Sequence, residues 1–436
     1  MLLRTPAATS PPGCDCLVAL GPTSRDGCTL FAKNSDRPGD ECQPLVQFAP
    51  REHGPEAEVR CQYLTIPQER RTYGFVAAQP YWLWGVEHGV NECQVAIGNE
   101  SVFTRDPVPE TGLLGMDLVR LGLERAETAR QAVEVITALL ETYGQGGPAL
   151  PGTGVGYHNS FLLADPADAW VLETSGKRWA ARRVRELGSI TNQLTLEDDW
   201  EIAAPDLESH AAAQGWWTAE RGRLSFAAAY RNEAVSGRMS EGRLARSRFL
   251  LRRGAGQLTE QALISFMRDH GESGSLPPEE RDPESASYFT LCMHAHPIST
   301  TTASMVARLR TSSDGLPDLW ACLGSPCTGV FLPVYLDGKL PPELSRGGPQ
   351  PDQQSPWWRM KALADETLAG PREGLVRLQQ TWADLERGFF DEAEGLAAEL
   401  TAMPERGLEP AGDRLKARLM ARAAGEMLRR LESFGF

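Results

Sequence analysis

The sequence lacks long hydrophobic segments and has little positive charge relative to its acidic residues. None of its apolar runs approaches the roughly 20 residues that a membrane-spanning helix requires, so we expect no membrane partner. Its 44 lysines and arginines are outnumbered by 58 aspartates and glutamates, which gives a formal net charge of −14. This balance disfavours nucleic acids and anionic membrane surfaces as partners.

We also expect neither an export signal nor a disulfide framework. The first residues, MLLRTPAATSPPG, lack the apolar core of a signal peptide. The nine cysteines are odd in number, and several lie in apolar, strand-like runs, as small buried residues do. We therefore expect reduced cysteines and a cytoplasmic location.

No metal or cofactor site is expected from the sequence. In the stretch CMHAH, Cys292, His294 and His296 lie on one face of a predicted strand and could offer soft metal ligands. No fourth ligand stands at a recognisable spacing, which favours a buried strand with tolerated histidines. The Gly-rich segments GQGGP and PGTGVG lack the Lys-Ser/Thr pair of a phosphate loop and are interpreted as turns.

The N-terminal stretch from Cys14 to Asp36 has the pattern of a β-hairpin. The apolar runs CLVAL and CTLFAKN flank Asp26-Gly27, a strong hairpin signal. Such a hairpin would return Asp36 to the neighbourhood of Cys14. If residues 1–13 were removed, Cys14 would carry an α-amine with a pKa of about 7.7–8.0, suited to act as a base toward its own thiol. The hairpin is therefore a candidate nucleophile site.

Short strand-like runs separated by turns continue to about Asn192. A second hairpin is predicted at Ser175-Gly176-Lys177, between AWVLET and RWAARRV. One helical block, 114–143, interrupts the strands, and Thr128 and Gln131 have the spacing of a capping box. Strands combined with compact helices predict an α+β fold in which helices cover the sheets.

The remainder of the chain is expected to hold helices near 243–253 and 259–270, further strands, and a helical tail. The predicted strands are YFTLCMHA, ASMVARL, LWACLG and GVFLPVYL. Two apolar stripes mark the tail helices: Leu375, Leu378, Trp382, Leu385 and Phe389, then Leu415, Leu419, Leu428 and Leu431. Amphipathic helices must cover an apolar surface, so we expect them to pack antiparallel and against the body or a partner subunit in a homo-oligomer.

The motifs that point to a known family are FAKNSDRPGDE, WLWGVEHGVNE, AIGNE, LLGMDLVRLGLERAETA, YGQGG, YHNSFLLAD, SITNQL and TTASMVA. They resemble the secernin-type members of the cysteine dipeptidase family of N-terminal nucleophile hydrolases. The resemblance is continuous from Cys14 to about Asn192 and patchy to about Leu309. It implies a four-layer αββα sandwich, which we place at residues 14–340, and a propeptide over 1–13. The apolar stripes, in contrast, predict the helical C-terminal extension over 355–436.

The resemblance also implies a nucleophile and its partners. Cys14 matches the family's nucleophile by its distance to the Asp26-Gly27 turn, and it would become N-terminal on maturation. Cys16 stays an alternative, because residues two apart on a strand point to the same face. Asp36 occupies the place of the aspartate that holds the α-amine.

Further roles follow from similarity to bile-salt hydrolases and penicillin acylases. Asn192 matches the asparagine that faces the oxyanion, and Asn99 the position of a second oxyanion donor through its backbone N–H. Arg248 would keep the thiolate ionised, since a cation lowers the pKa of a cysteine. Lys33 stands where those acylases carry an arginine, and we expect Lys33 and His158 to contact the substrate.

The sequence thus predicts a cysteine-type dipeptidase that acts on small peptides and uses no metal or organic cofactor. An acylase of small N-acyl compounds is the alternative with the same mechanism. A secernin-like protein that binds partners without catalysis is the alternative of a different class. A chain that begins at Cys14 after maturation would favour catalysis.

Overall fold

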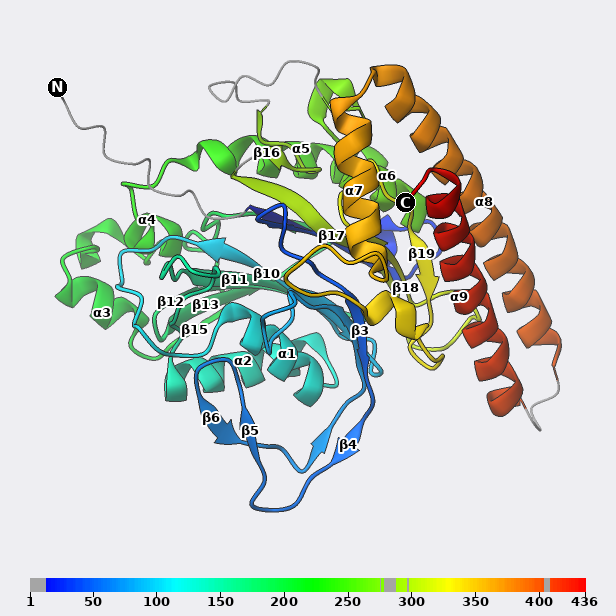
Figure 1. The fold of residues 1–436 in the computed structure, drawn as a ribbon. Helices are drawn as coiled ribbons and strands as arrows, with labels where there is room; N and C mark the ends of the chain where they lie inside the picture. The colour runs from blue at the N-terminus through cyan, green and yellow to red at the C-terminus, as the bar shows by residue number, and fades with distance from the viewer. Residues whose placement is uncertain (1–12, 275, 278–287, 296–297, 404–407) are drawn as a thin grey trace.

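The structure, a computed structural model, describes residues 13–274, 276–277, 288–295, 298–403 and 408–436. Two antiparallel sheets form its centre (Figure 1). In spatial order the first sheet contains β14 (Leu187–Ile190), β1 (Cys14–Ala19), β2 (Thr29–Arg37), β17 (Ser299–Leu309), β18 (Leu319–Leu323) and β19 (Leu332–Val334), with β16 (His294–Ala295) also paired to β17.

The second sheet follows the order β15 (Ile202–Ala203), β13 (Arg178–Arg183), β12 (Ala169–Ser175), β11 (His158–Ala164), β10 (Ala96–Val102), β9 (His88–Asn91), β8 (Phe75–Ala78) and β3 (Leu45–Phe48). Two small ribbons lie outside it: β4 (Arg51–Glu52) with β7 (Arg71–Thr72), and β5 (Glu58–Arg60) with β6 (Thr65–Pro67). The predicted second hairpin is confirmed, with β12 and β13 joined at Gly176, which has a φ of +59°.

The N-terminal hairpin is also confirmed. β1 and β2 pair antiparallel, with Cys14 opposite Ser35 and Cys16 opposite Lys33. Gly27 adopts a φ of +74°, which glycine reaches without the steric penalty of a Cβ atom. Both strands are buried along their whole length. Each has a neighbouring strand on both sides, and the second sheet and two helices cover the two faces of this part of the first sheet.

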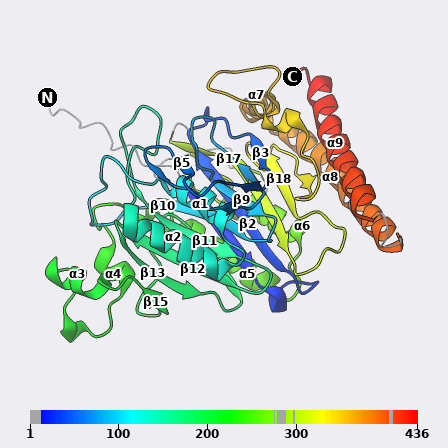
Figure 2. The same ribbon diagram turned by 90° about the horizontal axis from the view of Figure 1, so that it is seen from below.

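Two helices cover the outer face of the second sheet (Figure 2): α1 (Gly115–Arg125) and α2 (Ala129–Tyr143). The predicted cap is present, since the Thr128 side chain accepts a hydrogen bond from the Gln131 N–H. Gly122 allows close packing: a Cβ atom there would lie 2.7 Å from the Ile97 side chain on β10. The predicted helical block is therefore two helices packed on the sheet.

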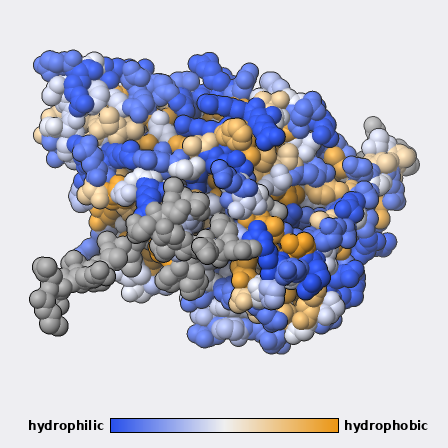
Figure 3. All heavy atoms as spheres, turned by 90° about the horizontal axis from the view of Figure 1, so that it is seen from above, coloured by the Kyte–Doolittle hydropathy of each residue, from blue (hydrophilic) through white to orange (hydrophobic). Residues whose placement is uncertain are grey.

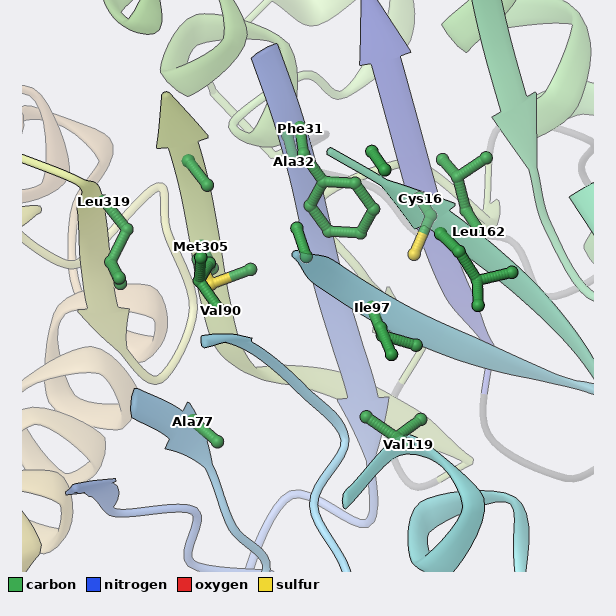
Figure 4. Close-up of a cluster of buried hydrophobic side chains, with 14 of the residues drawn as sticks. Cys16, Phe31, Ala32, Ala77, Val90, Ile97, Val119, Leu162, Met305 and Leu319 are labelled. Carbon is green, nitrogen blue, oxygen red and sulfur yellow. The ribbon is translucent and has the colours of Figure 1, made fainter. Parts of the chain in front are cut away.

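The inner faces of the two sheets pack against each other, with β1 against β10 and β11. Side chains from both sheets fill this interface, among them Cys16, Phe31 and Leu162 (Figure 4). The helices α5 (Glu241–Gly254) and α6 (Glu260–Met267) pack on the other face of the first sheet, α5 against β1 and β14 and α6 against β2 and β17. Short helices α3 (Leu207–Ala213) and α4 (Phe226–Tyr230) lie between β15 and α5 in the sequence.

Three C-terminal helices cover the β18–β19 end of the first sheet (Figure 1): α7 (Pro356–Ala369), α8 (Arg372–Ala402) and α9 (Leu408–Ser433). On α8, Trp382 is buried and donates its indole N–H to the Thr328 carbonyl at 2.8 Å. Phe390 stacks on Trp320 of β18 with ring centroids 3.8 Å apart. The predicted apolar stripes thus pack against the body of the same chain.

One face of the molecule is predominantly polar. On the face shown in Figure 3, hydrophilic residues cover most of the area and apolar residues gather in small separate groups. Within the described ranges, no helix is both long enough and apolar enough to cross a membrane.

The stretch YFTLCMHA forms less strand than predicted. Only its last part, His294–Ala295, pairs with β17. The preceding backbone bonds elsewhere: the Cys292 N–H donates to the Asp269 carbonyl at 3.1 Å, and the Leu291 carbonyl accepts from the Asn34 side chain at 2.7 Å. These partners replace ladder hydrogen bonds, so the segment runs as a loop. His296 lies outside the described residues.

Candidate active site

Cys14 is the first residue of β1 and lies between two neighbouring strands. On one side it is opposite Ser35 of β2. On the other side, Cys16 is opposite Ile190, and the same antiparallel register carried two residues further brings Asn192 opposite Cys14. The Cys14 backbone N–H donates a hydrogen bond to Asn192 Oδ1 at 2.8 Å. The nitrogen that would become an α-amine is therefore already held by a predicted site residue.

The thiol of Cys14 lies in a buried, polar environment. Its sulfur accepts a hydrogen bond from the Asp36 backbone N–H at 3.4 Å. Burial raises the pKa of the Cys14 thiol above its ordinary value, and the nearby ammonium of Lys33 acts in the opposite direction. Lys33 therefore favours the ionised thiol of Cys14, which is the effect that the sequence predicts for Arg248.

Asp36 is fully buried, and among the described residues only one of its two carboxylate oxygens has a hydrogen-bond partner. Its Oδ1 accepts a hydrogen bond from Thr301 Oγ1 at 2.6 Å, next to a register shift in β17 between Thr301 and Ala303. Its Oδ2 has no hydrogen-bond partner within the part of the chain that the structure describes. Burial, followed by the adjacent Asp15, raises the pKa of Asp36 well above its usual range. This carboxyl group can still accept one more donor.

Arg243, in the first turn of α5, connects these groups. Its guanidinium donates to the Cys14 carbonyl at 3.0 Å and to Asp15 Oδ2 at 2.6 Å. It also donates to Asn192 Oδ1 at 2.6 Å and lies 4.0 Å from Asp36 Oδ2. Arg243 is fully buried, so its charge compensates carboxylates that water does not reach.

The prediction that Arg248 acts on Cys14 is wrong. Five residues further along α5, its side chain points roughly 140° away from Arg243 around the helix axis. Arg248 instead lines a cavity of about 680 Å³ that also contains Arg182 and Arg252. Burial and these two arginines lower the pKa of Arg248. Arg243 is the arginine that the structure brings to Cys14.

The side chain of Lys33 extends from the first sheet to the second. It passes over Gly98, where a Cβ atom would lie 2.7 Å from Lys33 Cδ. Its ammonium donates to the backbone carbonyls of Glu87 at 2.7 Å and Asn99 at 2.6 Å, and it lies 3.2 Å from the Glu87 carboxylate. Lys33 is fully buried, so these contacts give it a positioning and electrostatic role beside the thiol.

The two predicted oxyanion residues are both near the site, but their side-chain amides are engaged. Asn192 Nδ2 donates to the carbonyl and to the hydroxyl of Ser101, both at 3.0 Å. Asn99 Nδ2 donates to Asn159 Oδ1 at 3.0 Å. Asn192 contacts Cys14 through its oxygen, whereas Asn99 is connected to the site through Lys33.

Cys16 shares the strand face of Cys14 but has different surroundings. Its sulfur lies 2.6 Å from the point where a Cβ atom on Gly98 would stand, deep in the interface between the sheets (Figure 4). Burial and the nearby carboxyl of Glu100 raise the pKa of Cys16 well above its usual value. Cys16 is a core residue, and this difference in environment favours Cys14 as the nucleophile.

His158 is buried on β11 and joins a different polar group. Its Nδ1 lies 2.6 Å from Thr104 Oγ1, which in turn lies 2.7 Å from Ser175 Oγ. Burial lowers the pKa of His158 to about 4, so the ring is neutral at pH 7. Within the described ranges, no hydrogen bond or ion pair connects His158 to Cys14, and its contact with a substrate stays a prediction.

Glu100 provides a test of the electrostatics near the site. It is fully buried, and burial raises its pKa to about 8. The unfolded chain releases this proton near pH 4.5, so between about pH 4.5 and 8 the folded state binds more protons than the unfolded state. The free energy of unfolding should therefore fall by on the order of a few kcal/mol across this range, and less steeply in Glu100→Gln.

Urea denaturation at pH 5 and pH 8 measures this effect. The wild-type protein should lose more stability between the two values than Glu100→Gln does. Equal losses in the two proteins would show that Glu100 is already ionised at pH 5.

Comparison with known proteins identifies a matching peptidase family and two similar dipeptidases. The profile of Peptidase family C69 matches residues 14–241. The chain is 31% identical over 221 residues to a dipeptidase of Bifidobacterium longum, covering 44% of this chain and 39% of that protein. It is 30% identical over 183 residues to the probable dipeptidase A of Streptococcus pyogenes, covering 39% and 37%. The matches thus span about two fifths of these relatives' length.

Among solved structures, the chain is similar to penicillin V acylase from Agrobacterium tumefaciens. That match has 16% identity and a TM-score of 0.42, covering 77% of this chain and 89% of the other. It is also similar to a mutant of the conjugated bile acid hydrolase from Clostridium perfringens, with 12% identity and a TM-score of 0.36, covering 71% and 89%.

Proposed function

The chain belongs to Peptidase family C69, and from this premise we propose that it is a cysteine-type hydrolase of peptide bonds with dipeptides as substrates. The family match begins at Cys14 itself, the residue that the N-terminal hairpin places at the candidate site. Two relatives carry the names dipeptidase and probable dipeptidase, which supports dipeptides as the substrate class.

The placement of the Cys14 backbone nitrogen carries this proposal. Asn192 Oδ1 accepts its hydrogen bond, and Asp36 Oδ2 is a buried oxygen that lacks a hydrogen-bond partner among the described residues. If residues 1–13 are removed as a propeptide, the nitrogen becomes an ammonium group bonded to Asn192 Oδ1, and Asp36, whose backbone N–H lies 3.4 Å from Cys14 Sγ, is the carboxylate that we propose as its second partner. The new positive charge would then favour the ionised form of Asp36, which burial otherwise disfavours.

The proposed reaction uses this amine as the base. The neutral α-amine of Cys14 takes the proton of its own thiol, and the sulfur attacks the carbonyl carbon of the peptide bond. The C–N bond breaks, and the leaving amine takes the proton from the α-ammonium group. Water, activated by the same amine, then hydrolyses the thioester and releases the acyl group as a carboxylic acid.

The negative oxygen of the tetrahedral intermediate requires hydrogen-bond donors. Asn192 Nδ2 would serve by exchanging a contact with Ser101 for the oxyanion, while Asn192 Oδ1 keeps its bond to Cys14. A backbone N–H near Asn99 is the proposed second donor, and Lys33 holds that segment through the Asn99 carbonyl. Removing one such donor typically lowers turnover about 10²–10³-fold.

We assign the fold to the four-layer αββα type of N-terminal nucleophile hydrolases, with the secernin subgroup as the proposed branch. The packing of α1 and α2 on one sheet and of α5 and α6 on the other supports this assignment. Residues 355–436 would then be an extension of the hydrolase domain, covering the β18–β19 end of its first sheet.

The Asp36→Asn substitution tests the role of the carboxylate. It preserves the side-chain shape but removes the charge that would stabilise the α-ammonium form of Cys14. Without that charge the pKa of the amine should fall by about 1 unit or more, and the acidic limb of the pH profile of kcat/KM should move to lower pH. The Thr301→Val variant is the control, because it removes one hydrogen bond to Asp36 and leaves the charge.

A substrate panel tests the proposed function directly. The mature protein should hydrolyse dipeptides, and alkylation of its thiols should stop the reaction. N-acyl amino acids belong in the same panel, since preferred cleavage of these would identify an acylase with the same mechanism. If a protein that begins at Cys14 cleaves neither class, the proposed activity is wrong.

A further inference from the structure

Four potential metal ligands from three separate parts of the chain meet in the interior. His270 follows α6, Cys292 and His294 belong to the segment that ends in β16, and Cys327 lies in the turn between β18 and β19. Their ligand atoms all lie within 4.8 Å of one another, and all four residues are buried. We propose that these residues bind one zinc ion, although the sequence predicted no metal.

The distances suit a tetrahedral ion. His294 Nε2 lies 3.3 Å from Cys292 Sγ and 3.1 Å from Cys327 Sγ. In a tetrahedral zinc site with Zn–S of about 2.3 Å and Zn–N of about 2.0–2.1 Å, sulfur and nitrogen ligands stand about 3.5 Å apart. Small side-chain shifts would therefore bring all four atoms into place around a central ion.

His270 supplies an independent indication. Its ring is 2% exposed, and its Nε2 has no hydrogen-bond partner in the described part of the chain. Its other nitrogen, Nδ1, lies 3.2 Å from the Gly274 carbonyl and can donate a proton to it. This bond fixes the tautomer in which Nε2 carries a free lone pair, the arrangement that metal-binding histidines use. An unpartnered nitrogen in a buried site is costly unless a ligand occupies it.

The ligand set identifies the metal and its role. Two thiolates and two imidazoles are the donors of structural zinc sites, in which four protein ligands complete the tetrahedron and leave no open position for catalysis. The structure holds both cysteines as free thiols, so neither is committed to a disulfide. The ion would therefore act as a crosslink between α6, the segment before β16 and the β18–β19 turn.

This crosslink would support the candidate active site. Met293, which lies between two of the ligands, donates its backbone N–H to Thr301 Oγ1 at 2.9 Å, and Thr301 donates to Asp36 Oδ1 at 2.6 Å. Asn34 of the N-terminal hairpin donates to the Leu291 carbonyl at 2.7 Å. Metal binding would thus fix the segment that positions the carboxylate, while taking no part in the chemistry.

Metal analysis of the full chain, purified without chelators or a histidine tag, tests the proposal. We expect one zinc ion per chain in the wild-type protein and at least about tenfold less in a Cys292→Ser/Cys327→Ser double variant. Cys322→Ser is the matched control, because Cys322 is a buried free cysteine on β18 outside the cluster, and it should keep the zinc. Equal zinc in the double variant would overturn the proposal.

Cobalt substitution of the wild-type protein provides a test that does not depend on how the variants fold. Co²⁺ should produce the visible bands of a tetrahedral site and a near-ultraviolet thiolate charge-transfer band, and Zn²⁺ should displace it. A folded wild-type protein that binds neither ion would contradict the proposal. A Cys292–Cys327 disulfide in protein freshly prepared under reducing conditions would do so as well.

Discussion

Replacement of Cys14 by alanine is expected to abolish hydrolysis of dipeptides, with a loss of at least about 10⁴-fold in kcat. The loss follows because the sulfur that would attack the substrate disappears, while every other group of the site remains. Cys14 is 5% exposed, and within the described residues its sulfur accepts a hydrogen bond at short range only from the Asp36 N–H, so the fold should tolerate the smaller side chain. Steady-state kinetics with one good dipeptide measures the effect.

Cys16→Ala is the matched control for this prediction. The two cysteines lie on the same face of β1, but Cys16 packs into the core between the sheets. Its truncation should cost about 1–2 kcal/mol in the free energy of unfolding and leave kcat within a few-fold of wild type. If Cys16→Ala is inactive and Cys14→Ala is active, the nucleophile is Cys16.

Replacement of Arg243 by methionine is expected to lower both stability and activity. The guanidinium is the buried cation that Asp15 contacts at 2.6 Å, and it lies 4.0 Å from Asp36. Removing one partner of a buried ion pair leaves an uncompensated charge and typically costs about 3–5 kcal/mol. The substitution also removes the donors to the Cys14 carbonyl and to Asn192, so kcat should fall together with the urea midpoint.

Two further variants distinguish this effect from general damage to α5. Arg248→Met removes a half-buried arginine from the same helix and should change the free energy of unfolding by about 0.5 kcal/mol or less. In the Arg243→Met variant, Asp15 and Asp36 are buried carboxylates without their cationic neighbour. Adding Asp15→Asn removes one of these two charges and should restore part of the stability. Arg248→Met and Arg243→Met variants that are equally unstable would refute the role given to Arg243.

The elements predicted most successfully from the sequence are those set by local signals. The Asp26-Gly27 and Ser175-Gly176-Lys177 turns, and the cap at Thr128, depend on neighbouring residues whose preferences are readable without the rest of the fold. The YFTLCMHA segment could not be predicted in the same way. Its backbone hydrogen bonds go to Asp269 and Asn34, which the sequence does not place beside it.

The residues of the candidate site also divide into those that local signals in the sequence predict and those that depend on the packing of distant elements. Cys14 and Asp36 were predicted together because one hairpin connects them, and Asn192 followed from the resemblance to a known family. The choice between Arg243 and Arg248 required knowledge of which flank of the buried face of α5 meets Cys14. The buried residues Leu244, Ser247 and Leu251 mark that face, and the two arginines lie on its opposite flanks. Arg243 reaches the Cys14 carbonyl and Asn192, whereas Arg248 lines a cavity on the other side.

The proposed metal site was beyond sequence interpretation for a related reason. Apart from Cys292 and His294, its ligands are widely separated in the chain, and the set lacks the two short paired spacings that make zinc fingers recognisable. The sequence pattern singles out Cys292 and His294, but His270 and Cys327 join them only through tertiary packing. The partnership between these residues is therefore visible only in three dimensions.

The intact mass of the purified, folded protein, combined with mapping of its N-terminal peptide, tests the proposed mechanism most directly. We predict a chain that begins at Cys14 and carries a free α-amine, because that amine is the proposed base. A protein that cleaves dipeptides while residues 1–13 remain attached would contradict the mechanism. In that case the Cys14 nitrogen would still be an amide and could not accept the proton of the thiol.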